Sequence, residues 1–113
     1  MTPVTQKKPT LHTVGIQING NGFLYRTPEN MIADTIRVRH GDHVKWNCHQ
    51  GNYTVLFKGE SPFAEVGIHA FKGADTSISM VVGKPGSYKY AVTVALPDGG
   101  LIVDDPEIIV ADD

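Results

Sequence analysis

The sequence predicts an all-β protein, folded as a single antiparallel Greek-key β-sandwich. Apolar and polar residues alternate in several short runs, as they do in strands that have one buried and one wet face. Turns rich in glycine and proline separate these runs at short intervals. No stretch has the apolar spacing of a long amphipathic helix.

Length and composition indicate one globular domain. The chain has 113 residues, of which 41% are hydrophobic and 19% charged. Its net charge of −2, with lysine and arginine scattered, gives no electrostatic footprint for nucleic acid. No apolar run approaches the roughly 20 residues that a membrane helix needs. We therefore expect neither a nucleic-acid partner nor a membrane partner.

The single cysteine and the N-terminus bear on the compartment. Cys48 has no second cysteine with which to form an intramolecular disulfide, which favours a reducing environment. The first residues lack the apolar segment of a signal peptide, so the expectation is a cytoplasmic protein. A secreted protein whose signal has been removed would have the same sequence. Residues 1–10 are predicted to be a disordered lead-in, and residues 11–113 the sandwich domain.

The first half of the domain is predicted to contain a series of short strands. In residues 11–18, the side chains of Val14, Ile16 and Ile18 fall on one face. Similar alternation or β-branched and aromatic content predicts strands at 23–26, 35–39, 44–49 and 53–57. Residues 58–75 lose the pattern and are expected to form a long connection, with a helical turn at 62–65.

The second half is dominated by one hairpin. Pro85 and Gly86 predict a tight turn, and residues 88–94 are aromatic or β-branched enough to be extended. The turn at 97–100 then reverses the chain into a strand at 101–103. Further strands are expected at 76–82 and 108–110. Between the last two strands, Pro106 cannot donate a ladder hydrogen bond, which indicates a bulge or a sheet edge there.

Three of these segments resemble motifs of the cupredoxin family. Residues 41–46 are similar to the G-D-x-V-x-W strand, residues 55–57 to the V-V-F strand, and residues 84–90 to the P-G-x-Y-x-Y entry to the copper loop. The resemblance covers roughly residues 34–110 and implies a cupredoxin-like sandwich. Immunoglobulin-like sandwiches share similar turns and are the alternative fold.

The copper ligands of that family do not carry over. Tyr53 or Asn52 occupies the place of the first histidine, Val92 that of the cysteine and Ala95 that of the second histidine. No methionine follows. Because thiolate and imidazole ligands define a type 1 copper site, the resemblance implies a scaffold without one. We accordingly expect no cofactor and no electron transfer.

A relocated metal site is the alternative function. Its ligands would be drawn from His40, His43, Cys48 and His49. His43 and His49 share a strand face but are separated by about 20 Å along it, and Cys48 shares the face of Trp46, as a core residue would. Solvated histidines and a buried cysteine are the simpler interpretation.

The main hypothesis is a non-catalytic binding or interaction module, because no nucleophile, phosphate loop or carboxylate pair has a recognisable catalytic context. Its surface is expected at the loop end of the sandwich, and its partner is an unidentified protein or small molecule. The candidate binding residues are His49, Asn52, Tyr53, Pro97 and Asp98. A homo-oligomer formed through an edge strand near Pro106 is a further expectation.

Overall fold

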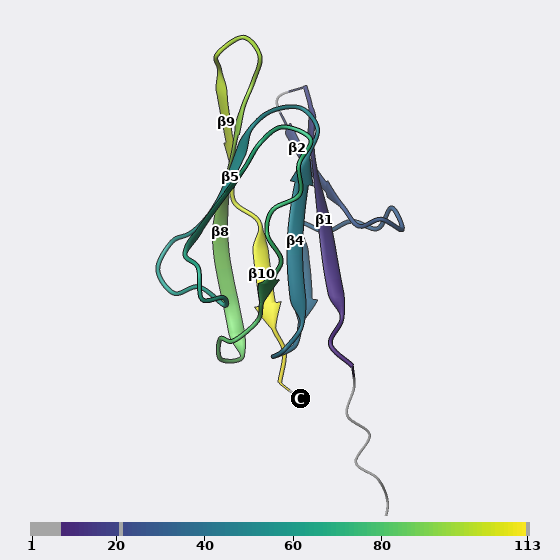
Figure 1. Ribbon diagram of the computed structural model, residues 1–113, viewed down its shortest axis with the longest axis vertical. Helices are drawn as coiled ribbons and strands as arrows, with labels where there is room; N and C mark the ends of the chain where they lie inside the picture. The colour runs from purple at the N-terminus through teal and green to yellow at the C-terminus, as the bar shows by residue number, and fades with distance from the viewer. Residues whose placement is uncertain (1–7, 21, 113) are drawn as a thin grey trace, which may run out of the picture.

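Two β-sheets face each other in the computed structural model, which describes residues 8–20 and 22–112 (Figure 1). The predicted all-β sandwich is confirmed. Its described residues form ten strands: β1 (Leu11–Asn19), β2 (Gly22–Arg26), β3 (Thr35–Val38), β4 (His43–Cys48), β5 (Tyr53–Phe57), β6 (Gly67–Ala70), β7 (Ser79–Met80), β8 (Gly86–Ala95), β9 (Leu101–Asp104) and β10 (Glu107–Val110). In the described part of the chain, no helix is long and apolar enough to span a membrane.

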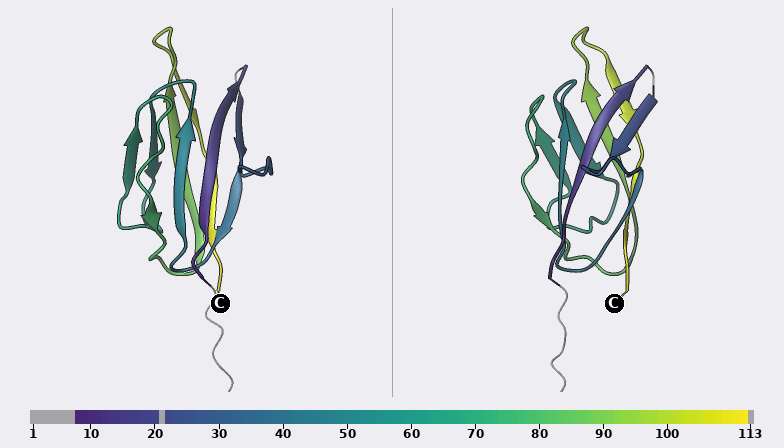
Figure 2. Two further views of the ribbon diagram at one scale, coloured as in Figure 1. Left: turned by 45° about the vertical axis from the view of Figure 1, so that its right-hand side comes forward. Right: turned by 90° about the vertical axis from the view of Figure 1, so that its right-hand side faces the viewer.

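The strands divide into a four-stranded and a six-stranded sheet. The smaller has the order β2-β1-β4-β7, and the larger has the order β3-β10-β8-β5-β6, with β9 also paired to β8. Figure 2 shows the two sheets from the side, with the β8–β9 hairpin projecting at one end. The sandwich is mixed rather than purely antiparallel, because β1 pairs with β4 and β3 with β10 in parallel. Alternation could not reveal this, since side chains alternate identically in both kinds of ladder.

The connection at 58–75 contains the strand that the sequence pattern missed. Within it, β6 pairs antiparallel with β5, placing Ile68 opposite Val55. Four residues between glycine-containing loops are too few to show a clear period. The helical turn expected at 62–65 is wrong. These residues form a bend, in which the Ser61 hydroxyl accepts a hydrogen bond from the Phe63 amide and donates one to the Glu65 carbonyl.

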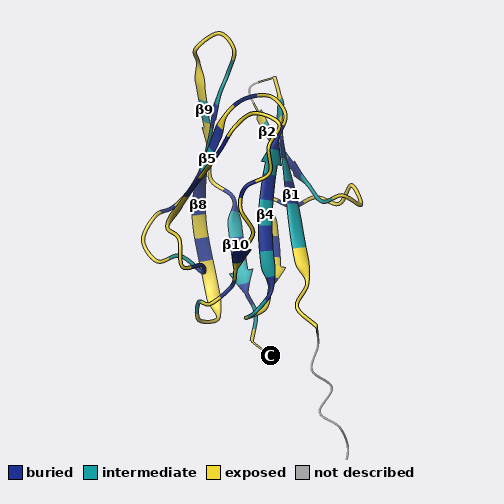
Figure 3. Ribbon diagram, in the orientation of Figure 1, coloured by how far each residue is buried: buried dark blue, intermediate teal, exposed yellow. Residues whose placement is uncertain are grey.

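The core is built around Trp46, which is fully buried between the sheets. Its indole N–H donates a hydrogen bond to the Tyr90 hydroxyl, 3.2 Å away. Its ring also packs edge-on against Tyr90 and Phe63, with centroid distances of 5.6 and 5.9 Å. Tyr88 and Tyr90 are both buried, and buried and exposed residues alternate along the first half of β8 in Figure 3. A residue of β4 thereby joins the four-stranded sheet to β8 of the other.

Pro106 marks neither an extra residue nor a free edge of β10. Asp104 lies opposite Val92 and Glu107 opposite Lys89, so the register is the same on both sides of the interruption. Pro106 is buried, and its carbonyl accepts the hydrogen bond of the Tyr90 amide, 3.1 Å away. β10 is not an edge strand, because it pairs with β3 on one side and with β8 on the other. The strand next to Pro106 that has a free edge is β9.

Asp42 fastens the start of β1 to the residues just before β4, at the same end of the sandwich. This buried carboxylate accepts hydrogen bonds from the amides of Thr10 and Arg39, each at 3.0 Å, and from His12 Nε2 at 2.9 Å. Burial raises the pKa of Asp42, but these hydrogen bonds outweigh burial and hold the pKa below its usual value. Most of the predicted lead-in at 1–10 lies outside the described residues.

Candidate functional site

The predicted loop-end residues lie where the β8–β9 hairpin projects (Figures 1 and 2). His49 and Asn52 belong to the connection between β4 and β5, and both are exposed. The Asn52 carbonyl accepts a hydrogen bond from the Ala95 amide at 2.9 Å, which places this connection beside the base of the hairpin. Pro97 and Asp98 are exposed farther along the turn.

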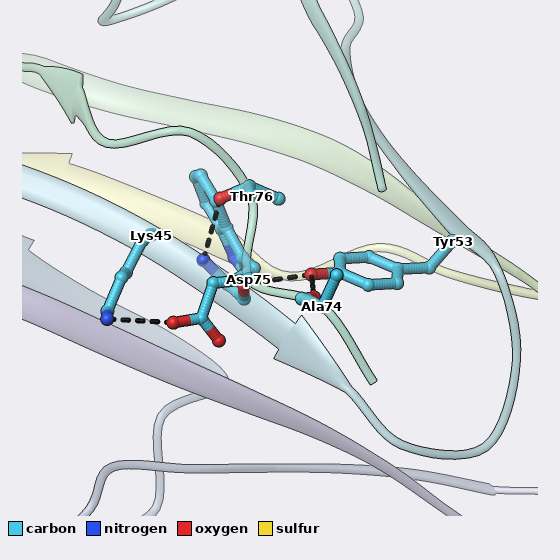
Figure 4. Close-up of polar contacts among 6 residues, drawn as sticks. Lys45, Tyr53, Ala74, Asp75 and Thr76 are labelled. Carbon is cyan, nitrogen blue, oxygen red and sulfur yellow. Dashed lines mark hydrogen bonds and ion pairs between the residues drawn. The ribbon is translucent and has the colours of Figure 1, made fainter. Parts of the chain in front are cut away.

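Tyr53 does not belong to this surface. Its side chain is 1% exposed, and its hydroxyl lies 2.8 Å from the Trp46 carbonyl and 2.6 Å from the Ala74 carbonyl (Figure 4). Burial, and then the charge of Asp75, raise the pKa of this phenol, so it stays protonated and donates. The inclusion of Tyr53 among the binding residues is therefore wrong: a position at the start of a strand resembled a loop end, but its side chain is directed into the core.

The same close-up shows how the segment after β6 is attached to β4. The Thr76 hydroxyl accepts a hydrogen bond from the Trp46 amide at 3.0 Å, and the Thr76 amide donates one to the Trp46 carbonyl at 2.9 Å. Lys45 pairs with Asp75 at 2.8 Å, and the hydrogen bond from Lys45 is the main reason why the pKa of Asp75 lies below its usual value. These contacts attach residues 74–76 to β4.

Gly51 is required by the close approach of the two connections. A Cβ atom at this position would lie 1.9 Å from the Ala95 carbonyl oxygen, a distance that no side chain can adopt. The backbone of the β4–β5 connection therefore packs directly on the end of β8.

The turn of the β8–β9 hairpin is closed by its own backbone. The Leu96 amide donates to the Gly100 carbonyl at 2.8 Å, and the Gly99 amide donates to the Leu96 carbonyl at 3.0 Å. Gly99 has a φ of 90°, which favours glycine, and Asp98 Oδ1 accepts the Gly100 amide. Asp98 is thus occupied in shaping the turn that sets the register of β9.

The positions that would hold copper in the resembled family are occupied by packing residues. Val92 is fully buried in β8, opposite Val55. The Asn52 side chain accepts the Lys72 amide at 2.8 Å, and Ala95 is partly buried at the end of β8. The residues at these positions supply no thiolate or imidazole.

The four candidate ligands of a relocated metal site are divided between the two ends of β4. His40 and His43 lie at its start, whereas Cys48 and His49 lie at its end, about 17 Å away at roughly 3.3 Å per residue. Cys48 is fully buried, as the pattern indicated. Among the residues that the structure describes, no three histidine, cysteine or acidic side chains are grouped closely enough to hold a metal ion.

His49 borders a shallow hollow of about 360 Å³ on the four-stranded sheet. The hollow lies where the end of β1 meets the β4–β5 connection. Gln50 partly fills this region by accepting the Ile18 amide and donating to the Ile18 carbonyl. Its remaining walls come from Ile16, Gln17, Asn19 and Leu24. The hollow is open, and no acidic, lysine or arginine side chain lines it.

A surface that the sequence analysis missed lies on the outer face of the six-stranded sheet. It consists of Leu56, Phe71, Leu101 and Val103, whose exposed fractions are 49, 68, 68 and 61%, and is called the outer patch below. Thr54 lies opposite Thr93 and Thr93 opposite Val103, so β5, β8 and β9 present one continuous face. His69 extends it through a 3.2 Å contact with Thr54 and an edge-on contact with Phe71.

A signal for the outer patch was present in the sequence. In residues 53–57, alternation places Leu56 on the face opposite Val55, although both are apolar. Leu101 and Val103 likewise share a face in a strand without a charged residue on that side. Runs of this kind predict a strand that is apolar on both faces, which in a two-layer sandwich leaves one face uncovered.

Comparison with known proteins adds little to this geometry. No protein-family model and no curated protein matches the chain. Among solved structures, it is similar to a chain of a heme-copper terminal oxidase dimer studied by cryo-EM, with 20% sequence identity and a TM-score of 0.47. The similarity covers 96% of this chain and 77% of the other. At this level it carries no argument about function.

Proposed function

We propose that this protein is a non-catalytic interaction module that binds a protein partner through the outer patch. The observation that carries the proposal is the exposure of four large apolar side chains on one face of one sheet. Monomeric proteins seldom expose contiguous apolar surface of more than a few hundred Å², and larger patches mark interaction sites. Covering apolar surface stabilises a complex by about 25 cal/mol per Å² before the costs of association.

The shape of the patch favours a protein over a small molecule. Small-molecule sites are concave and enclose most of their ligand. The outer patch instead extends across the paired strands β5, β8 and β9, with threonines between the apolar side chains. Such a surface, in which large apolar side chains alternate with hydroxyl groups, is compatible with the mixed composition of protein interfaces.

The scaffold that presents the patch is proposed to be cupredoxin-like. In support, Trp46 of the G-D-x-V-x-W-like segment is the central core residue, and Tyr88 and Tyr90 of the P-G-x-Y-x-Y-like segment face that core. Val92, in the place of the family's cysteine ligand, adds to the packing of the two sheets. The scaffold is accordingly proposed to serve binding rather than copper chemistry.

A site-specific photo-cross-linker tests the proposal. Benzoylphenylalanine would replace Leu56 in the outer patch, and in the control it would replace Met31, which is 65% exposed on a distant loop. In cells that make the protein, we expect discrete cross-linked proteins with the probe at position 56 and none of them with the probe at position 31. Identical products at both positions, or no product at position 56, would contradict the proposal.

A further inference from the structure

One edge of β9 has backbone groups directed away from the sheet. The Leu96 amide donates a hydrogen bond to the Gly100 carbonyl, and the Tyr90 amide donates one to the Pro106 carbonyl. In the ladder between β8 and β9, Leu96–Gly100 and Tyr90–Pro106 are therefore hydrogen-bonded pairs. Because such pairs alternate in an antiparallel ladder, Ile102 and Asp104 bond to β8, whereas Leu101 and Val103 do not. The N–H and C=O groups of Leu101 and Val103 therefore point outward from the sheet edge.

No other strand within residues 8–20 and 22–112 covers that edge. Among the described residues, β8 is the only strand that pairs with β9. The tip of the hairpin projects beyond the neighbouring loops (Figure 2), and Leu101 and Val103 are both exposed. Exposed edges with apolar side chains are templates for pairing with another strand unless charges, prolines or bulges block them.

The two carboxylates next to this edge, those of Asp104 and Asp105, have partners within the chain. Asp104 turns toward the other sheet, where its carboxylate accepts a hydrogen bond from the Tyr25 hydroxyl at 3.0 Å. Asp105 lies 3.7 Å from the ammonium group of Lys58. The edge thus presents Leu101 and Val103 without a free carboxylate between them.

We infer that two copies of this protein pair through their β9 edges, antiparallel and about a two-fold axis at Ile102. This inference goes beyond the proposed function: the partner at this edge is a second copy of the chain, whereas the outer patches remain open to a further protein. Leu101 of one copy lies opposite Val103 of the other. The backbone of each residue donates one hydrogen bond to its counterpart and accepts one from it. The two six-stranded sheets become continuous, and their outer patches meet side by side.

This register is favoured by side-chain complementarity. It places apolar side chains opposite each other on the outer face, and it places Asp104 and Asp105 opposite Gly100 and Gly99 of the second copy. A shift that paired Val103 with Val103 would place Asp105 opposite Leu101. Lys58 and Lys89 lie close to Asp105, at the end of β9. In the proposed register, Asp98 of the second copy approaches these two lysines.

Sedimentation velocity of the full chain, from low micromolar to several hundred micromolar, tests the association. We expect a concentration-dependent dimer that Val103→Lys abolishes and that Met31→Lys, with the same change in charge at a distant exposed site, leaves intact. Val103→Pro provides a second test, because its lost N–H points away from β8. Circular dichroism would verify that each variant is folded. A wild-type protein that stays monomeric throughout this range would overturn the inference.

Cysteine cross-linking tests the register. Under mild oxidation, Ile102→Cys should form a disulfide-linked dimer, since position 102 faces itself across the axis at a distance that a disulfide can span. Val103→Cys alone should not, whereas a mixture of Leu101→Cys and Val103→Cys proteins should. A cross-link with Val103→Cys instead of Ile102→Cys would overturn the proposed register.

The outcomes separate this inference from the proposed function. A monomer whose position 56 cross-links to a different protein overturns self-pairing and supports the interaction module. A monomer without any cross-link at position 56 contradicts both.

Discussion

The hydroxyl of Tyr25 in β2 lies 3.0 Å from the carboxylate of Asp104 in β9 and joins the two sheets beside the projecting hairpin. Tyr25 is fully buried and stacks on Phe23, with a centroid distance of 6.0 Å. Burial and the hydrogen bond to Asp104 raise the pKa of this phenol, so it donates throughout the ordinary pH range. This contact holds β9 in place and directs its aspartate away from the free edge.

Tyr25→Phe should lower the free energy of unfolding by about 2 kcal/mol, because it removes a hydrogen bond to a charged group and leaves the carboxylate partly buried. Urea unfolding followed by Trp46 fluorescence measures the change. Tyr88→Phe is the matched control, since its hydroxyl bonds a neutral carbonyl, that of Lys84, and about 1 kcal/mol is expected. Equal losses in the two variants would show that the charge of Asp104 adds nothing.

Gly51→Ala should destabilise the protein by about 3 kcal/mol, because the new Cβ would lie 1.9 Å from the backbone oxygen of Ala95 and the strands must separate. Gly22→Ala is the control. Its Cβ would meet the Asn19 carbonyl oxygen at 3.6 Å, an ordinary contact, so a change below about 1 kcal/mol is expected. Thermal unfolding of both variants makes the comparison, and similar melting temperatures would contradict the close approach.

Asp42 should make stability fall in acid. Its pKa is lower in the folded protein than in the unfolded chain, so its contribution is complete above the unfolded value of about 3.9 and is lost as the pH falls through the folded value. Urea unfolding at a series of pH values from 7 to 2 measures this loss. Asp42→Asn should be less stable at pH 7, and its stability should decline less below pH 4. A variant with an unchanged acid profile would argue against these hydrogen bonds as the cause.

Incubation with copper, zinc or nickel followed by desalting should leave no stoichiometric metal on the protein. His43 and Cys48 are about 17 Å apart along β4, and Cys48 is buried, so the candidate ligands cannot share one ion. Elemental analysis provides the measurement. Retention that disappears in His49→Ala or Cys48→Ala would revive the relocated metal site.

Local patterns were enough to predict most strands and the side of each that is buried. Alternation placed Val14, Ile16 and Trp46 inward, and glycine and proline located the turn at 97–100. The turn predicted at Pro85 and Gly86 is a bend that ends where β8 begins, at Gly86. The buried state of Cys48 followed from the same period. These features depend on the order of neighbouring residues, which is why they can be recognised without a partner strand.

The candidate site depended on contacts between distant segments. Tyr53 follows a glycine-containing loop in the sequence, yet the carbonyls of Trp46 and Ala74 bind its hydroxyl in the core. The parallel pairings of β1 with β4 and of β3 with β10, and the pairing of β9 with β8 alone, also arise only when separated strands meet.

Most strands and their inward faces followed from the order of the residues alone, because they depend on a period of two residues and on local backbone preferences. The short strand β6 did not. Only the tertiary structure decided which apolar face is left uncovered and which strand edge is left unpaired. Leu56, Leu101 and Val103 are of the same residue types as core residues, yet no second layer of the described chain covers them.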